Sequence, residues 1–171
     1  VELFNGSDSL GTVVAADNGT FSITSSLLAD ADYTLTVTAT DAAGNTSAPS
    51  TGLPITIDTT APAQPAITTD IALTKINTPT ITGTAEAGST VELFNGSDSL
   101  GTVVAADNDT FSITSSVLAD DIYTLTVRAT DLAGNVSAES VGLPIEIDTT
   151  APAAPLITTT TSLTKINTPT I

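Results

Sequence analysis

The chain repeats itself with a period of 90 residues. Its first ten residues, VELFNGSDSL, return unchanged at positions 91–100, and aligning residues 1–81 with 91–171 leaves about fifteen differences. A repeat of this length matches a whole small domain, whereas solenoid proteins repeat every 20 to 45 residues or so. We therefore expect copies of one small domain arranged in tandem.

Apolar and polar residues alternate within the repeat as they do in half-buried β-strands, and no stretch keeps the spacing of an amphipathic helix. The clearest example is residues 123–130, where Tyr, Leu, Val and Ala alternate with Thr and Arg. Turn residues separate such runs, which predicts an all-β fold of tandem immunoglobulin-like β-sandwiches with seven strands per repeat. In the second copy the expected strands A to G are 65–68, 79–84, 90–94, 100–104, 110–114, 123–130 and 141–147.

Two local features support this fold. Residues 95–99, NGSDS, are rich in turn formers and suit a hairpin between the expected strands C and D. Tyr123 lies near the start of strand F, where immunoglobulin-like domains carry a tyrosine corner, although the residues before it lack the glycine expected there. Tyr33 and Tyr123 are both expected to pack on the core.

A short joint follows each strand G. The sequence IDTTAP occupies residues 57–62 and returns at 147–152, before a segment with regularly spaced prolines. Proline restricts the backbone, so each joint is expected to be stiff. The joints divide the chain into a partial domain at 1–58 with strands C to G, a complete domain at 59–148, and a partial domain at 149–171 with strands A and B.

The charge of the chain excludes several partners. Three Lys and Arg residues stand against 19 Asp and Glu, for a formal net charge of −16, so the basic clusters that bind nucleic acid or anionic membranes are missing. No apolar run approaches the roughly 20 residues of a membrane-spanning helix, so no membrane insertion is expected. The absence of His and Cys removes the usual nucleophile and base pairs, and we do not expect an enzyme.

Three motifs together resemble the bacterial Ig-like repeats of very large secreted adhesins, of the RTX type and the biofilm-associated type. They are Leu-Ala-Asp ahead of Tyr-Thr-Leu-Thr-Val, then Ala-Thr-Asp-x-Ala-Gly-Asn, then Ile-Asp-Thr-Thr-Ala-Pro, and the similarity covers the whole chain. The resemblance implies a secreted or cell-surface extender with calcium at its domain junctions. Its partners would be the neighbouring repeats of the same chain.

The residues themselves also indicate calcium. In a sandwich, the B to C, D to E and F to G loops lie at the end that meets the incoming linker, so carboxylates converge on the joint. Two of them about 4 Å apart repel by roughly 4 kcal/mol at an effective dielectric constant near 20. Calcium binds oxygen ligands, whereas zinc sites normally use the His and Cys that this chain lacks.

The expected ligands of this calcium form three groups. Asp58, Asp131 and Asn135 are the first candidates, and Glu86 and Asp107 are weaker ones. Counterparts in the partial domains are Asp41, Asn45 and Asp148. Further acidic residues expected near the joint are Asp109 from the complete domain and Asp8, Asp30 and Asp32 from the preceding one.

Simpler explanations stay open for several of these residues. The segment 131–135 suits a turn in which Asp131 accepts backbone hydrogen bonds and Gly134 is left-handed. Asp58 suits an Asx-turn that caps the amides of Thr59 and Thr60. Asp98, Asp120 and Asp121 are expected to be solvated loop charges.

The functional prediction is an extender repeat of a surface adhesin, made rigid by calcium at the joints and supporting cell adhesion and biofilm formation. The alternative is a module that binds a glycan or protein ligand at its loops. A calcium-independent spacer differs from the first prediction only at the joints. The partial end domains also expose strand edges, which predicts head-to-tail strand complementation with another copy of the chain.

Overall fold

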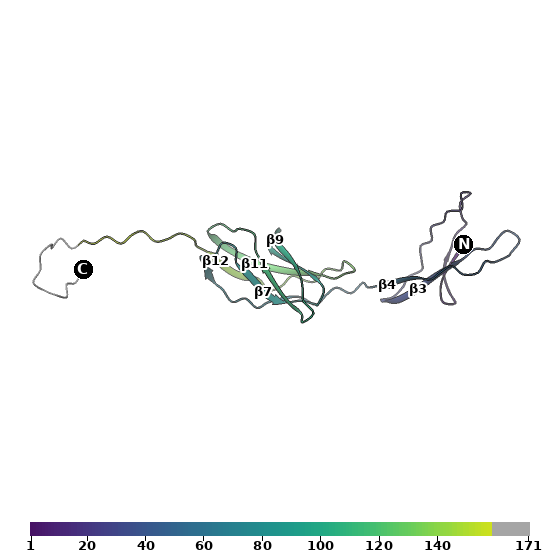
Figure 1. The fold of residues 1–171 in the computed structure, drawn as a ribbon, viewed down its shortest axis with the longest axis horizontal. Coiled ribbons are helices and arrows are strands. Elements are labelled where there is room, and N and C mark those ends of the chain that lie inside the picture. Colours follow the sequence, from purple (N-terminus) through teal and green to yellow (C-terminus); the bar gives the residue numbers. More distant parts are fainter. Residues whose placement is uncertain (159–171) are drawn as a thin grey trace, which may run out of the picture.

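The computed structural model describes residues 1–158, which form two units of strands and loops (Figure 1). The N-terminal unit is one antiparallel sheet in the order β2-β1-β3-β4. Residues 20–24, the counterpart of the expected strand E, form no strand. The bounds are β1 (Glu2–Asn5), β2 (Asp8–Thr12), β3 (Ala31–Thr38) and β4 (Leu53–Ile57).

The second unit is a sandwich of two sheets, which confirms the predicted all-β class. One sheet has the order β10-β7-β5 and the other the order β6-β12-β11-β8-β9. The bounds are β5 (Ala66–Ile67), β6 (Leu73–Thr74), β7 (Thr80–Thr84), β8 (Thr90–Asn95), β9 (Asp98–Val104), β10 (Thr110–Thr114), β11 (Asp121–Thr130) and β12 (Leu143–Ile147).

The alternation read from the sequence sets which side chains face the core. In β7 and β10 every second residue is buried, and the residues between them are exposed Thr and Ser. Ile81 and Ile113 lie opposite each other in register and are 0% and 3% exposed. They join Leu93, Leu125 and other aliphatic side chains from both sheets in one core cluster.

The predicted hairpin is present between β8 and β9, with a tighter turn than expected. Asn95 pairs with Asp98, so only Gly96 and Ser97 form the loop. Gly96 has a φ of 59°, and glycine at the first loop position is typical of a type II′ turn, which suits the twist of the two strands.

One detail of the expected seven-strand order differs in the structure. Of the expected strand A, 65–68, only Ala66–Ile67 form a strand, β5, which pairs with β7. Residues 73–74, which were expected in no strand, form β6, which runs parallel to β12 in the other sheet. The segment expected as strand D is β9, and it pairs with β8 as the predicted hairpin requires. Alternation identifies a strand and its buried face, but both sheets bury one face here, so it does not fix the partner.

Tyr123 occupies the expected corner position, and Tyr33 makes the equivalent contact in the first unit. The Tyr33 hydroxyl donates to the Ala29 carbonyl at 2.9 Å, and the Tyr123 hydroxyl donates to the Ala119 carbonyl at 3.1 Å. The body of Tyr123 packs against the core cluster. These bonds tie the start of β3 and of β11 to the preceding loop without the expected glycine.

Residues 1–158 contain no helix long and apolar enough to cross a bilayer. The expected partial domain at 149–171 falls mostly outside the described residues, which end at 158.

Candidate functional site at the interdomain joint

The joint of residues 57–62 connects β4 of the first unit to the segment before β5 of the second (Figure 1). No regular structure covers residues 58–65, so side chains must fix the path of the linker. Two sets of side chains do so, one from each unit.

The preceding unit holds the linker through Asp30. Its Oδ1 accepts hydrogen bonds from the Thr59 amide at 3.1 Å and the Thr59 hydroxyl at 2.8 Å. Its Oδ2 accepts one from the Thr60 hydroxyl at 2.8 Å. Antiparallel pairing explains the contact, because Ala31 lies opposite Ile57 and Asp30 therefore lies beside the residues that follow β4.

The same arrangement recurs at the second joint. Asp120 accepts from the Thr149 amide at 2.9 Å, the Thr149 hydroxyl at 2.7 Å and the Thr150 hydroxyl at 2.8 Å. Asp121 pairs with Ile147, just as Ala31 pairs with Ile57. We call each set of one aspartate and two threonines a linker clamp.

The hydrogen bonds of the clamps also act on their carboxylates. Bonds from Thr59 and Thr60 hold the pKa of Asp30 below its usual value, and bonds from Thr149 and Thr150 do the same for the pKa of Asp120. Donors that favour the charged form lower a carboxyl pKa. Both clamps are therefore fully formed at neutral pH.

The sequence interpretation missed the clamps. It expected Asp120 to be a solvated loop charge and Asp30 to be one of several acidic residues near the joint. A signal was available, because Leu-Ala-Asp at 28–30 and Thr-Thr at 59–60 both return 90 residues later. Asp32 instead accepts from the Thr56 hydroxyl across β3 and β4 at 2.6 Å, and Asp8 begins β2 opposite Asn5.

Asp58 forms the Asx-turn that was left open as an alternative. Its Oδ1 accepts from the Thr60 amide at 3.0 Å, and Asp148 accepts from the Thr150 amide at 2.9 Å. One carboxylate oxygen of each residue is therefore used within the linker. The second oxygen of Asp58 remains available at the joint.

The following unit contacts the linker through the loop between β11 and β12. Asn135 Nδ2 donates to the backbone oxygen of Asp58 at 3.0 Å and to Asp131 Oδ2 at 2.9 Å. Asp131 Oδ1 accepts from the amides of Gly134 and Asn135, both at 2.8 Å. Asp131 and Asn135 therefore contact each other, and Asn135 also contacts the backbone of Asp58.

The loop itself has the turn conformation that was left open as the simpler explanation. Gly134 has a φ of 97°, a left-handed conformation in which a side chain would be strained. The bonds from Asn135 hold the pKa of Asp131 below its usual value, against the opposing effect of burial. In the first unit Asp41 and Asn45 make the same turn, with Asn45 Nδ2 donating to Asp41 Oδ2 at 2.8 Å.

The weaker candidates stay apart from this group. Glu86 and Asp107 are exposed, and no hydrogen bond within residues 1–158 links their carboxylates to Asp58, Asp131 or Asn135. No group of three or more His, Cys, Asp or Glu side chains in residues 1–158 is arranged to hold a metal ion. The joint offers two carboxylates, with an amide and backbone carbonyl oxygens completing the set of possible ligands.

Asp109 has a structural role near this end of the second unit. Its Oδ1 accepts from the Ala87 amide at 3.1 Å, and its backbone oxygen accepts from the Ala85 amide at 3.0 Å. Its φ is 62°, a left-handed value, where the first copy has Gly19 with a φ of 81°. Asp109 thus ties the loop that carries Glu86 to the loop before β10.

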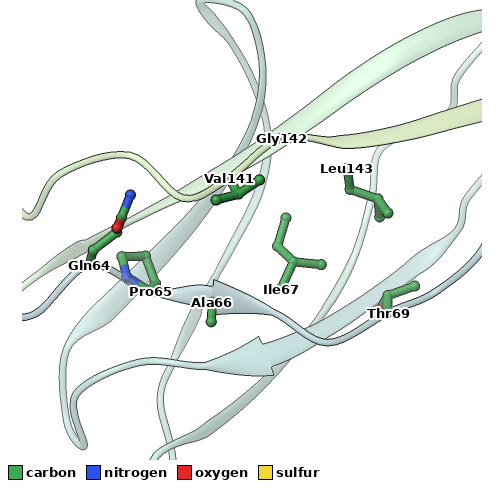
Figure 2. A pocket seen from close by; sticks show the side chains of 8 residues that line it. All are labelled: Gln64, Pro65, Ala66, Ile67, Thr69, Val141, Gly142 and Leu143. Carbon is green, nitrogen blue, oxygen red and sulfur yellow. The ribbon is translucent and has the colours of Figure 1, made fainter.

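A pocket of about 310 Å³ lies at the edge of the sandwich, between β5 and the residues that lead into β12 (Figure 2). It opens there because β5 pairs with β7 while β12 belongs to the other sheet. Ile67, Val141 and Leu143 form its apolar part, and Gln64 supplies an amide at one end. Its lining has no charged or aromatic side chain, so it lacks the groups that usually orient a sugar or an ion.

Comparison with known proteins finds relatives that are much longer than this chain. It is 36% identical over 172 residues to Exoglucanase B of Cellulomonas fimi and 38% identical over 164 residues to Chitinase A1 of Niallia circulans. These alignments cover 90% and 88% of this chain. The chain spans only 15% and 22% of the length of those two proteins.

Solved structures support the fold. Fibronectin(III)-like modules of Clostridium thermocellum CbhA match with a TM-score of 0.55 at 16% identity, over 85% of this chain and 76% of that one. A biofilm-associated protein BSP domain matches with a TM-score of 0.42 at 22% identity, over 88% of this chain and 25% of that one, which is too distant to carry a functional conclusion.

A family profile gives the assignment. The profile of the bacterial Ig-like domain matches residues 1–59 and again residues 66–149, which together make up most of the sequence. The chain therefore belongs to the bacterial Ig-like domain family, with two copies of the domain in tandem.

Proposed function

We propose that the chain is a structural extender of a secreted or cell-surface bacterial protein, in which repeated domains set length and direction. The observation that carries this proposal is the attachment of the linker to both of its neighbours. Asp30 binds Thr59 and Thr60 from the preceding unit. Asn135 binds Asp58 from the following unit. A linker fixed on two sides loses conformational freedom and so passes the direction of one domain to the next.

The relatives support an accessory role without catalysis. This chain corresponds to a small part of an exoglucanase and of a chitinase, and a module of this size beside other domains suits a spacer. Proteins that act on insoluble polysaccharides work outside the cell, which supports an extracellular location. The resemblance to large adhesins extends the proposal to cell adhesion and biofilm formation.

Calcium at the joint is the second part of the proposal. Asp131 Oδ2 and the Asp58 backbone oxygen, from different units, converge on the Asn135 amide group. A hard cation needs the same convergence of oxygen atoms, and a half-turn of the amide would present the Asn135 oxygen in place of its nitrogen. Oxygen donors of this kind are the type that calcium accepts, and bound calcium would draw on the carboxylates of Asp58 and Asp131.

The main ligands of the ion would be Asp58, Asp131 and Asn135. Glu86 and Asp107 would reach the ion only if their loops moved. Bound calcium would supply positive charge between carboxylates of two units. Asp131 is already held in place by its loop amides, so the site costs little ordering of the following unit. Asp41, Asn45 and Asp148 are the equivalent positions of the neighbouring joints.

Thermal unfolding with and without calcium tests this site. We expect calcium to raise the unfolding temperature of the wild-type chain, since ligand at a hundred times its dissociation constant stabilises the bound state by about 2.7 kcal/mol. Asp131→Asn should lose most of that increase. Asp98→Asn is the matched control, because it also removes one negative charge. Asp98 lies in the β8–β9 hairpin, where it pairs with Asn95. This hairpin is at the opposite end of β8 from Thr90.

Two outcomes would contradict the calcium proposal. One is an equal calcium response in wild type, Asp131→Asn and Asp98→Asn, which would indicate general screening of negative charge. The other is an unfolding temperature that calcium does not change in any of the three proteins. The joint would then be held by hydrogen bonds alone, and the chain would be a calcium-independent spacer. Small-angle X-ray scattering with and without chelator then measures whether the angle between the units still has a narrow distribution.

A second candidate function is carbohydrate binding, favoured by the relatives named as an exoglucanase and a chitinase. The pocket in Figure 2 argues against it because its lining has no aromatic side chain on which a sugar could stack. Sedimentation of the chain with insoluble cellulose and chitin is the direct assay. We expect the chain to stay in solution, and retention by either polymer would favour the second candidate.

A further inference from the structure

The outer edge of β12 is only partly covered. The five-stranded sheet ends with β6 beside β12, but β6 has two residues and pairs only with Glu146 and Ile147. Residues 143–145 therefore have β11 on one side and no strand of residues 1–158 on the other. A free strand edge of this kind is a template on which a strand of another chain can pair.

The pocket in Figure 2 lies beside the start of this free stretch, at residues 141–143. Its apolar part comes from Ile67, Val141 and Leu143, and the Val141 side chain is 82% exposed. A strand added to β12 would bury its own side chains in this pocket while its main chain pairs with the edge, as in β-augmentation.

The opposite edge of the five-stranded sheet is protected in two ways. The Ser116 amide donates to the Leu100 carbonyl at 2.7 Å, which ties β9 to the segment that follows β10. The pairing of β9 with β8 also contains a bulge after Leu93, and bulges twist an edge away from new partners. The free stretch of β12 has no bulge in its pairing with β11, and no segment of residues 1–158 pairs along it. It needs protection of another kind.

Main-chain hydrogen bonds show which residues of β12 face the free side. The Glu146 amide donates to the Ala72 carbonyl at 2.9 Å, and the Asp148 amide donates to the Thr74 carbonyl at 3.0 Å, both on the side away from β11. Successive residues of a strand present their amides to opposite sides, so residue 144 also faces the free side. Residue 144 is a proline, which has no amide hydrogen to donate.

We propose that Pro144 protects the edge of β12 against pairing with a second copy of the chain. An added strand would meet a carbonyl but no donor at the middle of the free stretch, and proline within sheets is confined to such edges. Pro54 holds the same position in β4, opposite Thr34, as Pro144 holds opposite Thr124.

A second copy is the partner that the repeat makes most abundant. Tandem units with nearly the same sequence present the same strands at high local concentration, which favours misassembly between units. The inference does not depend on the proposed calcium site, since the free stretch of β12 and the joint at residues 57–62 are separate parts of the chain.

Light scattering coupled to size exclusion, over a wide range of concentrations of the full chain, tests this role. Pro144→Val supplies the missing amide and a residue that favours strands. Its mass should rise toward twice the monomer mass at concentrations at which the wild type does not associate. Thr124→Val is the matched control, because it adds valine at the exposed position paired with residue 144 and leaves the edge of β12 unchanged. It should behave like the wild type.

Adding Val141→Asp to Pro144→Val gives the reverse test. The aspartate places a charge in the pocket beside the edge, so the double variant should return to the mass of the wild type. Hydrogen exchange is the second readout. In Pro144→Val, the new amide at position 144 should exchange more slowly at high concentration than at low concentration. Pro144→Thr carries the same tests if Pro144→Val does not fold.

Three results would overturn the proposal. One is a Pro144→Val protein whose mass equals that of the wild type at every concentration. Another is equal association of Thr124→Val, which would assign the effect to added apolar surface. The third is association that Val141→Asp leaves intact or that gives no protection at position 144, because the contact would then lie elsewhere.

Discussion

Single aspartates decide how the units are linked. Asp30 and Asp120 each gather two threonines that lie 29 and 30 residues later in the chain. Each contact is exposed, so none contributes much by burial. Their effect is to select one path for a linker that has no regular structure, and identical clamps at both joints give the same exit direction each time.

The clamps should open in acid. The folded pKa of Asp120 lies below its usual value because of bonds from Thr149 and Thr150, whereas the unfolded value is near 3.9. Stabilisation from such a group is present above that value and disappears as pH falls through the folded pKa. In an NMR titration, the Thr59 and Thr149 amide shifts should move only below about pH 3.9.

Asp120→Asn separates the two clamps in this titration. It should abolish the acid transition at Thr149 and leave that at Thr59 unchanged, because Asp30 serves the first joint. A Thr149 transition that persists in the variant would mean that another group controls the second joint.

Variants of Asp109 test how well the second unit tolerates a residue other than glycine in a left-handed backbone conformation. Asp109→Ala should lower the free energy of unfolding by about 1 kcal/mol, because it removes the hydrogen bond to Ala87 while the positive φ remains. Asp109→Asn keeps an acceptor oxygen and a residue that tolerates this conformation, so it should stay within about 0.5 kcal/mol. Urea unfolding measures both, and equal losses would show that the negative charge itself matters.

At the scale of elements, β7 closes the core of the second unit. Gly83 in this strand lies opposite Phe111 in β10, and a Cβ atom there would overlap the Phe111 ring and the Ala66 carbonyl oxygen. The glycine thus allows β5 and β10 to approach β7 from both sides while the Phe111 ring covers the backbone.

Gly83→Ala should therefore destabilise the second unit by about 1 to 3 kcal/mol, the usual cost of overpacking. Thr84→Val is the matched control in the same strand. Its side chain is exposed and valine favours strands, so a change within about 0.5 kcal/mol is expected. Chemical unfolding measures both variants, and a stable Gly83→Ala would mean that β5 can move away at little cost.

At the scale of the whole molecule, net repulsion opposes compact domains. The formal net charge of −16 should make the unfolding temperature rise as monovalent salt screens the carboxylates. Calcium at equal ionic strength should raise it further if the joint binds the ion. A calcium effect no larger than that of matched sodium chloride would show that screening accounts for the whole response.

The sequence alone determined the repeat, the positions of the main strands, the hairpin between β8 and β9 and both joints. These depend on local patterns, namely alternation, turn residues and the order of loops in a sandwich. Only the tertiary structure limited the expected strand A to β5, added β6 beside β12 and brought Asp30 to Thr59. Such contacts join distant segments, and the pattern within a segment records which face is buried but not which neighbour buries it.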